Sequence, residues 1–183
     1  MCLEFSKTKI NDLMLIKNFV SRDIRGEFVK IFNNNFFNNS DLKIDVKESY
    51  YSVNNQFVIR GMHFQRPPND HSKLVCVPKG EIIDVVIDLR KNSSTYGIYD
   101  SFKLSSNNGN SLYIPAGCAH GFMAMTNDTI TLYYQSTVYN KASDDGIRYD
   151  SFGYDWKINN PIISERDSNF RSFLDFEKIN PFK

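Results

Sequence analysis

Residues 109–122 read Gly109-Asn110-Ser111-Leu112-Tyr113-Ile114-Pro115-Ala116-Gly117-Cys118-Ala119-His120-Gly121-Phe122. Gly109 permits the backbone conformation of a hairpin turn, and the apolar run at 112–114 is typical of a β-strand. Pro115 and Gly117 then turn the chain at a corner, because proline ends a strand and glycine tolerates a sharp bend. We expect His120 to open the next strand and to point into the mouth of a barrel.

The sequence on both sides of this segment is also typical of short β-strands. Short runs of β-branched and aromatic residues alternate with polar turn signals such as Asn54-Asn55 and Pro78-Lys79-Gly80. Between them, the chain lacks the long periodic stretches that the helices of a parallel α/β fold require. The pattern predicts an all-β protein built as an antiparallel sandwich or barrel. The expected strands are 50–53, 57–60, 74–77, 82–89, 111–114 and 129–134.

Two segments outside these strands carry other expectations. The asparagine-rich stretch 33–39 contains Phe36 and Phe37, so we expect a short helix or loop beside the core. The stretch from Ser164 to Phe176 follows Asn159-Asn160-Pro161 and is expected to supply a helix. A length of 183 residues fits one domain over 1–183, with its core at about 21–167.

Composition excludes several classes of protein. Lys and Arg number 22 against 21 Asp and Glu, so the chain lacks the basic excess that tracks a nucleic acid, and we expect no such partner. No apolar run approaches the roughly 20 residues of a membrane helix, and the N-terminus lacks a signal-peptide pattern. Three scattered cysteines, Cys2, Cys76 and Cys118, indicate neither a disulfide framework nor a metal knuckle. We expect a soluble, cytoplasmic and reduced protein.

Three histidines are candidates for chemistry. His71 follows the polar loop Pro67-Pro68-Asn69-Asp70 and is expected at the surface. His63 comes just after an expected strand, in Arg60-Gly61-Met62-His63-Phe64-Gln65. A single histidine in such a place is by default buried and hydrogen-bonded.

The pattern Gly109-x5-Pro115-x-Gly117-x2-His120 resembles the second motif of the cupin superfamily, whose fold is a double-sheet jelly roll. In metal-binding cupins this histidine acts with a His-x-His pair and a glutamate. Here the pair is absent and Lys73 takes the place of the glutamate. A lysine cation repels a metal and attracts an anion, so we expect an anion-binding pocket without metal or other cofactor.

The motifs together resemble the dTDP-4-dehydrorhamnose 3,5-epimerase family, over most of the chain and in family order. The resemblance implies a cupin-type jelly roll with short flanking helices. The motifs that carry it are Asp23-x-Arg25-Gly26-x-Phe28, Arg60-Gly61-Met62-His63-Phe64-Gln65, Lys73-Leu74-Val75, the run from Gly80 to Gly97, Ile114-Pro115-Ala116-Gly117-x2-His120-Gly121-Phe122, Gly146-Ile147-Arg148-Tyr149-Asp150, Asp155-Trp156 and Ile163-Ser164-Glu165-Arg166-Asp167.

The resemblance implies a cofactor-independent isomerase that inverts C3 and C5 of a nucleoside-diphosphate 4-keto-6-deoxy sugar for surface polysaccharide synthesis. By family position, His63 is the catalytic base, paired with Asp167. Tyr133 is the opposing acid, because its spacing from His120 and Tyr139 matches the family's tyrosine. Lys73 and His120 are expected to hold the enolate oxygen.

The remaining positions are expected to bind substrate. Arg60 suits the diphosphate, and Arg25 is expected to reach it from a neighbouring subunit, because the family forms dimers that exchange N-terminal strands. Two positions depart from the family: Lys30 replaces a glutamate, and Glu48-Ser49-Tyr50 replaces Gln-Asp-Asn. Both changes affect nucleotide or sugar contacts. The substrate-binding set is Arg25, Lys30, Glu48, Tyr50, Arg60, Lys73, His120, Tyr139, Asp144 and Arg166.

Three alternatives remain open from the sequence. A single-carbon epimerase acting on a GDP- or CDP-linked hexose or heptose would use the same residues. A metal-dependent cupin oxygenase or isomerase is disfavoured by Lys73 and by the missing His-x-His pair. A non-catalytic jelly roll that binds a sugar or a nucleotide would not need His63, Tyr133 and Asp167.

Overall fold

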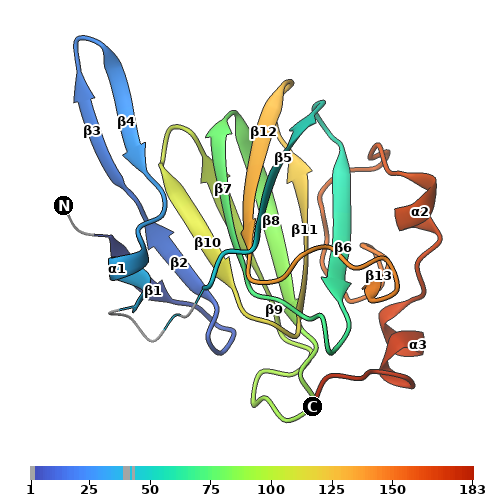
Figure 1. The fold of residues 1–183 in the computed structure, drawn as a ribbon. Coiled ribbons are helices and arrows are strands. Elements are labelled where there is room, and N and C mark those ends of the chain that lie inside the picture. The colour runs from blue at the N-terminus through green and yellow to red at the C-terminus, as the bar shows by residue number, and fades with distance from the viewer. Residues whose placement is uncertain (1–2, 39–41, 43) are drawn as a thin grey trace.

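The computed structural model describes residues 3–38, 42 and 44–183, and its strands form two sheets that face each other (Figure 1). The first sheet contains, in spatial order, β1 (Glu4–Lys7), β2 (Met14–Lys17), β10 (Asn110–Ile114), β7 (Lys73–Lys79), β12 (Thr129–Gln135) and β5 (Glu48–Asn54). The second contains β13 (Asp144–Gly146), β6 (Ile59–Gln65), β11 (Cys118–Ala124), β8 (Glu81–Asp88) and β9 (Tyr99–Ser105). Neighbouring strands in both sheets run antiparallel. The expected double-sheet jelly roll is confirmed.

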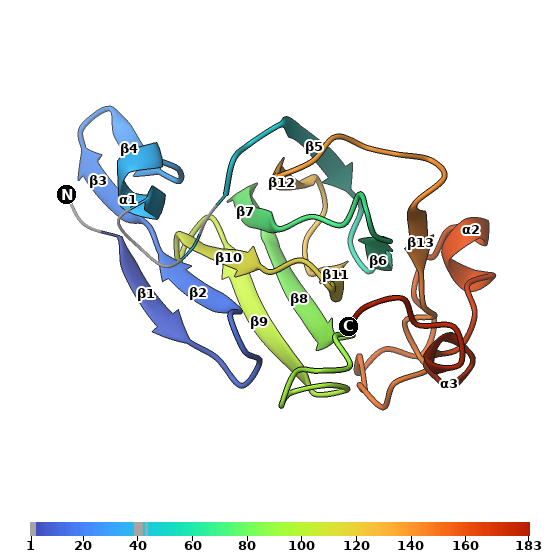
Figure 2. The same ribbon diagram turned by 60° about the horizontal axis from the view of Figure 1, so that its bottom comes forward.

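A separate hairpin and three short helices flank the sheets. The hairpin consists of β3 (Phe19–Asp23) and β4 (Gly26–Lys30), and it projects from the barrel at the upper left of Figure 1. Helix α1 (Asn34–Asn38) follows it. Helices α2 (Glu165–Ser168) and α3 (Phe173–Glu177) lie at the opposite side of the molecule, next to β6 and β13 (Figure 2). None of the helices in the described ranges has the length and apolar run needed to cross a bilayer.

The space between the sheets holds one hydrophobic cluster. Side chains alternate between the two faces of a strand, and in β12 every second residue is buried. Val75, Leu112 and Tyr133 of the first sheet pack there against Ile82 and Val86 of the second. Each large apolar side chain removed from water contributes about 1.5–3 kcal/mol.

The outer faces of both sheets are covered as well. Trp156, Phe176 and Phe182 from the C-terminal segment pack on the outside of the second sheet. Phe37 of α1 and Leu3 pack on the outside of the first sheet. The C-terminal segment therefore encloses the strand that carries His63.

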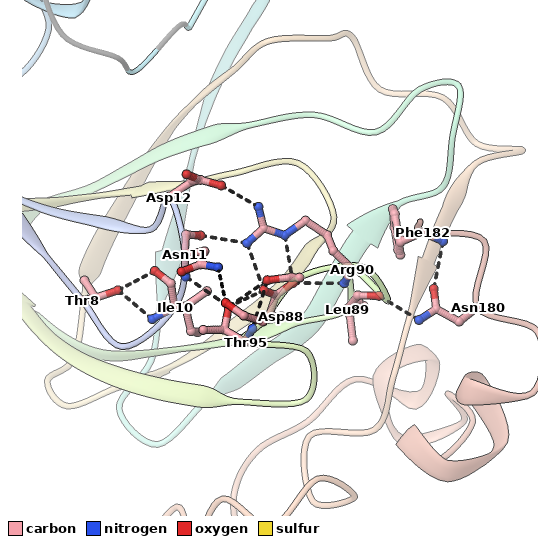
Figure 3. Close-up of polar contacts among 12 residues, drawn as sticks. Thr8, Ile10, Asn11, Asp12, Asp88, Leu89, Arg90, Thr95, Asn180 and Phe182 are labelled. Carbon is pink, nitrogen blue, oxygen red and sulfur yellow. Dashed lines mark hydrogen bonds and ion pairs between the residues drawn. The ribbon is translucent and has the colours of Figure 1, made fainter.

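Arg90 ties the β1–β2 loop to the chain that follows β8, and Asn180 ties the C-terminal segment to it (Figure 3). Its guanidinium donates to both oxygens of the fully buried Asp88 at 2.9 Å, and to Asp12 in the β1–β2 loop at 2.9 Å. Asn180, near the C-terminus, donates to the carbonyl of the neighbouring Leu89 at 2.7 Å. The buried carboxylate is thus neutralised by a cation that also fixes the surrounding loops.

The strands expected in the middle of the chain are confirmed, with shifted ends. One shift matters, because β6 spans Ile59–Gln65 and His63 therefore lies inside a strand rather than just after one. Gly61, with φ +136°, lies within this strand and against the neighbouring β11, where an added Cβ would clash with Gly121 Cα.

The flanking expectations are partly confirmed. Helix α1 lies within the asparagine-rich stretch and buries Phe37, whereas Asn39 and Cys2 fall outside the described residues. The stretch 164–176 forms two short helices, because Ser164 and Ser172 each cap a new helical start. The strands β1 to β4, β9 and β13 were not predicted from the sequence.

Candidate active site

A pocket of about 330 Å³ lies between the two sheets and is lined by residues from both. It brings together most of the site residues expected from the sequence. Those in its wall are Glu48, Tyr50, Arg60, His63, Lys73, His120, Tyr133, Tyr139, Asp144 and Arg166.

His63 on β6 is paired with Asp167 in α2. The imidazole Nε2 lies 2.9 Å from Asp167 Oδ1, and the other carboxylate oxygen accepts the Gly61 N–H at 3.1 Å. Burial raises the pKa of Asp167, but the hydrogen bonds and charge of His63 outweigh this effect and leave that pKa below its ordinary value. The carboxylate therefore stays ionised and holds the Nε2–H tautomer, so that Nδ1 carries the lone pair.

The local sequence explains how Asp167 reaches this position. Ser164 caps α2 by accepting the backbone N–H of Asp167 at 3.1 Å, which fixes the first turn of the helix. Gly61 lets β6 lie against β11 and presents its N–H to the carboxylate. The expected pairing of His63 with a late aspartate is present in the structure.

Tyr133 enters the pocket from β12, in the sheet that faces β6. Its ring stacks on Tyr50 with centroids 4.8 Å apart, and meets the edge of His120 at 6.1 Å. Burial and the neighbouring Tyr50 raise the pKa of Tyr133 well above its ordinary value. Tyr50 accepts a 2.6 Å hydrogen bond from Gln135, and burial raises its pKa to about 12. Both phenols are therefore protonated and available as donors near neutral pH.

Lys73 and His120 lie in the same pocket above a buried carboxylate. Burial lowers the pKa of Lys73 to about 8, against the opposing effect of Asp84 and Asp144. Asp84 Oδ1 lies 3.3 Å from His120 Nδ1, and its Oδ2 has no hydrogen-bond partner in the described part of the chain. Burial raises the pKa of Asp84 well above its ordinary value and lowers that of His120 well below. Asp84 was not among the expected site residues, although a lone aspartate inside the apolar run 82–87 is a signal for a buried functional carboxylate.

A network of acidic residues and their partners forms one rim of the pocket. Asp144 accepts from Arg166 at 2.7 Å and from the Tyr139 hydroxyl at 3.2 Å. The backbone N–H of Tyr139 donates to Glu48 at 2.6 Å. These contacts explain why four of the expected binding positions from distant parts of the chain meet here.

The arginines expected to bind the diphosphate are separated in this chain. Arg60 lines the pocket, where its Nε donates to Asn54 at 2.6 Å, and its other guanidinium nitrogens bond to no group in the part of the chain that the structure describes. Arg25 stands at the tip of the β3–β4 hairpin, paired with Asp23 and outside the pocket lining. Lys30 ends β4 and also lies outside the lining.

His71 is buried, so the expectation of a surface residue is wrong. The ring is 8% exposed and lines the pocket. The loop before it folds back so that Gln65 and Thr137 surround Nδ1 at 3.0 and 3.3 Å. The polar loop before it concealed this burial, because Asn69 in that loop hydrogen-bonds to Gln65, Thr137 and Ser143.

The described residues contain no group of three His, Cys, Asp or Glu side chains arranged to hold a metal ion. The pocket combines a histidine–carboxylate pair, a facing tyrosine and a buried cation beside a neutral histidine. This set suits proton removal and return next to a carbonyl group, with the cation stabilising the enolate. The fold and the site together define a cupin-type epimerase.

Comparison with known proteins identifies the family. The sequence model of dTDP-4-dehydrorhamnose 3,5-epimerase matches residues 7–175. The enzyme of that name from Methanothermobacter thermautotrophicus is 38% identical, over 91% of this chain and 92% of its own. That from Shigella flexneri is 34% identical, over 92% and 95%.

A solved structure agrees with these relatives. The crystal structure of dTDP-4-dehydrorhamnose 3,5-epimerase from Bacillus anthracis, with TDP and PPi bound, has a TM-score of 0.91 and 28% identity. The structural match covers 94% of this chain and 100% of the Bacillus anthracis chain. The chain belongs to the dTDP-4-dehydrorhamnose 3,5-epimerase family.

Proposed function

We propose that this protein converts dTDP-4-dehydro-6-deoxyglucose into dTDP-4-dehydrorhamnose by inverting C3 and C5. One observation carries the proposal. His63 on one sheet and Tyr133 on the facing sheet line the same pocket, and Asp167 of α2 lies at hydrogen-bond distance from the His63 imidazole. A base and an acid on facing walls are what inversion at carbon requires, because the proton leaves one face and returns to the other.

The ketone at C4 makes the reaction accessible without a cofactor. It acidifies the C–H bonds at C3 and C5, since the electron pair left by either proton delocalises onto the C4 oxygen. His63 Nδ1 takes the proton, and Asp167 stabilises the imidazolium that forms. The Tyr133 phenol then delivers a proton to the opposite face of the enolate. The His63 imidazolium then releases its proton to solvent and the Tyr133 phenolate takes one up, so that a second cycle can invert the other carbon.

Lys73 and His120 stabilise the enolate oxygen in this proposal. The Lys73 cation is buried and therefore acts in a medium of low dielectric constant, where charge stabilisation is strong. The pKa shifts of Asp84 and His120, both caused by burial, favour the neutral forms of both groups. The Asp84 carboxylic acid donates a hydrogen bond to His120 Nδ1, so the neutral imidazole carries its own proton on Nε2 and can donate it to the enolate oxygen.

The nucleotide diphosphate is bound by arginine in this proposal. Arg60 supplies donors within the pocket, and Arg25 joins it from a second subunit in a homodimer that exchanges its N-terminal hairpin. The projecting β3–β4 hairpin supports this arrangement, because Ile24 and Phe28 on it are exposed. Lys30 then lies on the segment that reaches the partner's nucleotide.

Glu48 and Tyr50 contribute to substrate selection at the rim of the pocket. Tyr50 contacts Tyr133 directly and so affects the placement of the proposed acid. Tyr139, Asp144 and Arg166 complete this rim through their mutual hydrogen bonds. A substrate that binds here therefore either breaks these hydrogen bonds or adds its own to the same side chains.

Proton NMR in D2O with a panel of nucleotide-linked 4-keto-6-deoxy sugars tests the proposal. We expect the C3 and C5 proton signals of the dTDP-linked sugar to disappear as deuterium replaces them. Loss at one carbon alone would make the protein a single-carbon epimerase. Exchange only with a GDP- or CDP-linked sugar would reassign the nucleotide, and no exchange with any member of the panel would contradict an epimerase.

A further inference from the structure

Asn54, the last residue of β5, carries a buried amide that contacts two residues of the pocket wall. It is 1% exposed, and its Oδ1 accepts the Arg60 Nε–H at 2.6 Å. Its Nδ2 has its two shortest contacts with the Thr129 carbonyl oxygen at 3.0 Å and with Ser52 Oγ at 3.1 Å. Arg60 and Ser52 line the pocket, whereas Asn54 lies behind them and outside the lining. Asn54 can therefore affect a ligand only through these neighbours.

The orientation of the Asn54 amide follows from the chemistry of its partners. An arginine Nε–H only donates, so it requires the amide oxygen. The Thr129 carbonyl only accepts, so it requires the amide nitrogen. A flipped amide would place an N–H group against Arg60 and an oxygen against the carbonyl, and would lose both hydrogen bonds. The amide therefore accepts from Arg60 and donates to Ser52.

The hydrogen bond to Asn54 fixes the direction of the Arg60 guanidinium. Arg60 is an exposed residue of the pocket wall, and its Nη1 and Nη2 bond to no group within the described ranges. Because the guanidinium is planar and rigid, a partner at Nε also orients the two Nη groups. A side chain that is oriented before its ligand arrives loses less conformational freedom on binding. Asn54 thus prepares this cation for a phosphate group.

The Ser52 hydroxyl connects the same amide to Tyr133. The two residues lie on paired strands, where Ser52 is opposite Thr131 and Tyr133 is opposite Tyr50. Residues two apart share a face, so Ser52 is the diagonal neighbour of Tyr133 on the pocket side. Burial raises the pKa of Tyr133, whereas a hydrogen bond with the Ser52 side chain lowers it. A hydrogen bond has this effect when the phenol oxygen accepts, so the Ser52 O–H is the donor.

This arrangement suits an acid that gives up its proton to a substrate. Ser52 Oγ accepts from Asn54 Nδ2, which leaves its own hydrogen for the Tyr133 oxygen. The phenol hydrogen is then available to the substrate, and the phenolate that remains keeps a hydrogen-bond donor. Tyr133 is 6% exposed, so water contributes little to this stabilisation.

We propose that Asn54 is a positioning residue that acts on two groups at once: its oxygen orients Arg60 for the diphosphate, and its nitrogen holds the Ser52 hydroxyl on the acid Tyr133. The inference rests on the proposed function, because it requires a diphosphate at Arg60 and proton delivery by Tyr133. Ser52 is a second positioning residue, since it acts only through the phenol. The proposal predicts one effect on nucleotide binding and another on inversion.

Calorimetry with dTDP tests the effect on Arg60. Asn54→Ala should weaken dTDP binding about 3- to 10-fold, because the guanidinium loses its fixed orientation. In an Arg60→Ala background the same change should have no further effect, since the group that Asn54 orients is already missing. Unchanged binding by Asn54→Ala, or an equal loss in both backgrounds, would overturn the proposal.

The rate of product formation tests the effect on Tyr133. Ser52→Ala should lower kcat about 3- to 10-fold and leave dTDP binding within about twofold. Ser52→Thr keeps the hydroxyl and should restore most of the rate. In a Tyr133→Phe background, Ser52→Ala should have no further effect. A normal rate in Ser52→Ala, or an equal loss in both backgrounds, would overturn the proposal.

A measurement on the wild-type protein covers the case in which Asn54→Ala does not fold. With ¹⁵N-labelled arginine, the NMR signal of the Arg60 Nε–H is assigned by its loss in Arg60→Lys. We expect this hydrogen to be protected from solvent exchange with and without dTDP, and exchange as fast as in free arginine would overturn the proposal. The inference alone is wrong if these tests fail while the wild-type protein exchanges C3 and C5 protons. A wild-type protein that exchanges neither proton contradicts the proposed function.

Discussion

His63 Nε2 and Asp167 Oδ1 lie 2.9 Å apart, although 104 residues separate them in the chain. The carboxylate is fixed from two further directions, by the Gly61 N–H and by the Ser164 cap of its helix. The pair is therefore rigid before substrate arrives, which is the arrangement that a general base needs. Several predictions on proton transfer depend on this geometry.

His63→Ala should reduce C3 and C5 proton exchange about 10²- to 10⁴-fold, because the base is removed. Binding of dTDP should stay within about twofold, since Arg60 and the nucleotide contacts are retained. Exchange is followed by NMR in D2O and binding by calorimetry. Asp167→Asn serves as the matched variant, and we expect it to lose activity through the wrong tautomer while keeping its fold. Normal turnover in His63→Ala would remove this residue from the mechanism.

Tyr133→Phe should separate proton removal from inversion. The base is intact, so deprotonation at one carbon should continue, but the acid that delivers a proton to the opposite face is missing. We expect solvent deuterium to enter the substrate with its configuration retained, while product formation falls about 100-fold or more. Tyr134→Phe, on the neighbouring position of the same strand, is the control and should remain active. Full inversion by Tyr133→Phe would assign the acid to another group.

The Lys73 ammonium should set the alkaline limit of activity. Its pKa in the folded protein is lowered to about 8 by burial, so the cation is present below that pH and is lost above it. We expect kcat/KM to fall as pH rises through about 8, because the neutral amine stabilises an enolate poorly. Lys73→Gln should lower activity and abolish this alkaline limb. A profile that stays flat from pH 7 to pH 10 in the wild-type protein would contradict the assignment.

Arg25 should act in the site of a partner subunit. Arg25→Ala alone is expected to raise KM about tenfold or more, since a charged phosphate contact is lost. Mixing Arg25→Ala with His63→Ala should restore activity, because half of the sites in a mixed dimer then contain both wild-type residues. Activity assays after mixing, with sedimentation to establish the dimer, check this. A fully active monomer would defeat the exchange of hairpins.

Arg90 should contribute to stability rather than to catalysis. Arg90→Met leaves the buried Asp88 carboxylate without its cation, and we expect a loss of about 3–5 kcal/mol in the free energy of unfolding. The pKa of Asp88 in the folded protein lies below its ordinary value, because the Arg90 hydrogen bonds outweigh the effect of burial. The difference in the free energy of unfolding between the wild-type protein and Arg90→Met should therefore be complete above about pH 4 and shrink as pH falls further. Urea unfolding at several pH values measures it, and an equal loss at all pH values would contradict this ion pair.

The core of the fold could be predicted because its signals are local. The strands around β7, β8, β10 and β12 are short apolar runs bounded by turn residues, and the corner at Pro115 and Gly117 has a strong backbone signature. Strands β1, β3 and β4 carry mixed, largely exposed sequences, since they lie at an edge or project from the barrel. Their pairing depends on tertiary contacts that periodicity does not report.

The site was predicted where a family motif marked it and missed where burial depended on the fold. His63, Tyr133, Lys73 and His120 meet in one pocket as expected. His71 was placed at the surface because its neighbours in sequence are polar, although one of them, Asn69, hydrogen-bonds to Gln65 and Thr137. Asp84 went unnoticed for the opposite reason, since its strand was assigned to packing alone.

The long sequence separation within the His63–Asp167 pair has a consequence for protein synthesis. A ribosome completes the strand that bears His63 well before it reaches the helix that bears the aspartate. A nascent chain can therefore bury its first strands while its base still lacks an orienting carboxylate. In the proposed mechanism, His63 gains its orienting carboxylate only when the segment that carries Asp167 docks, so we expect a prematurely terminated chain to lack this activity.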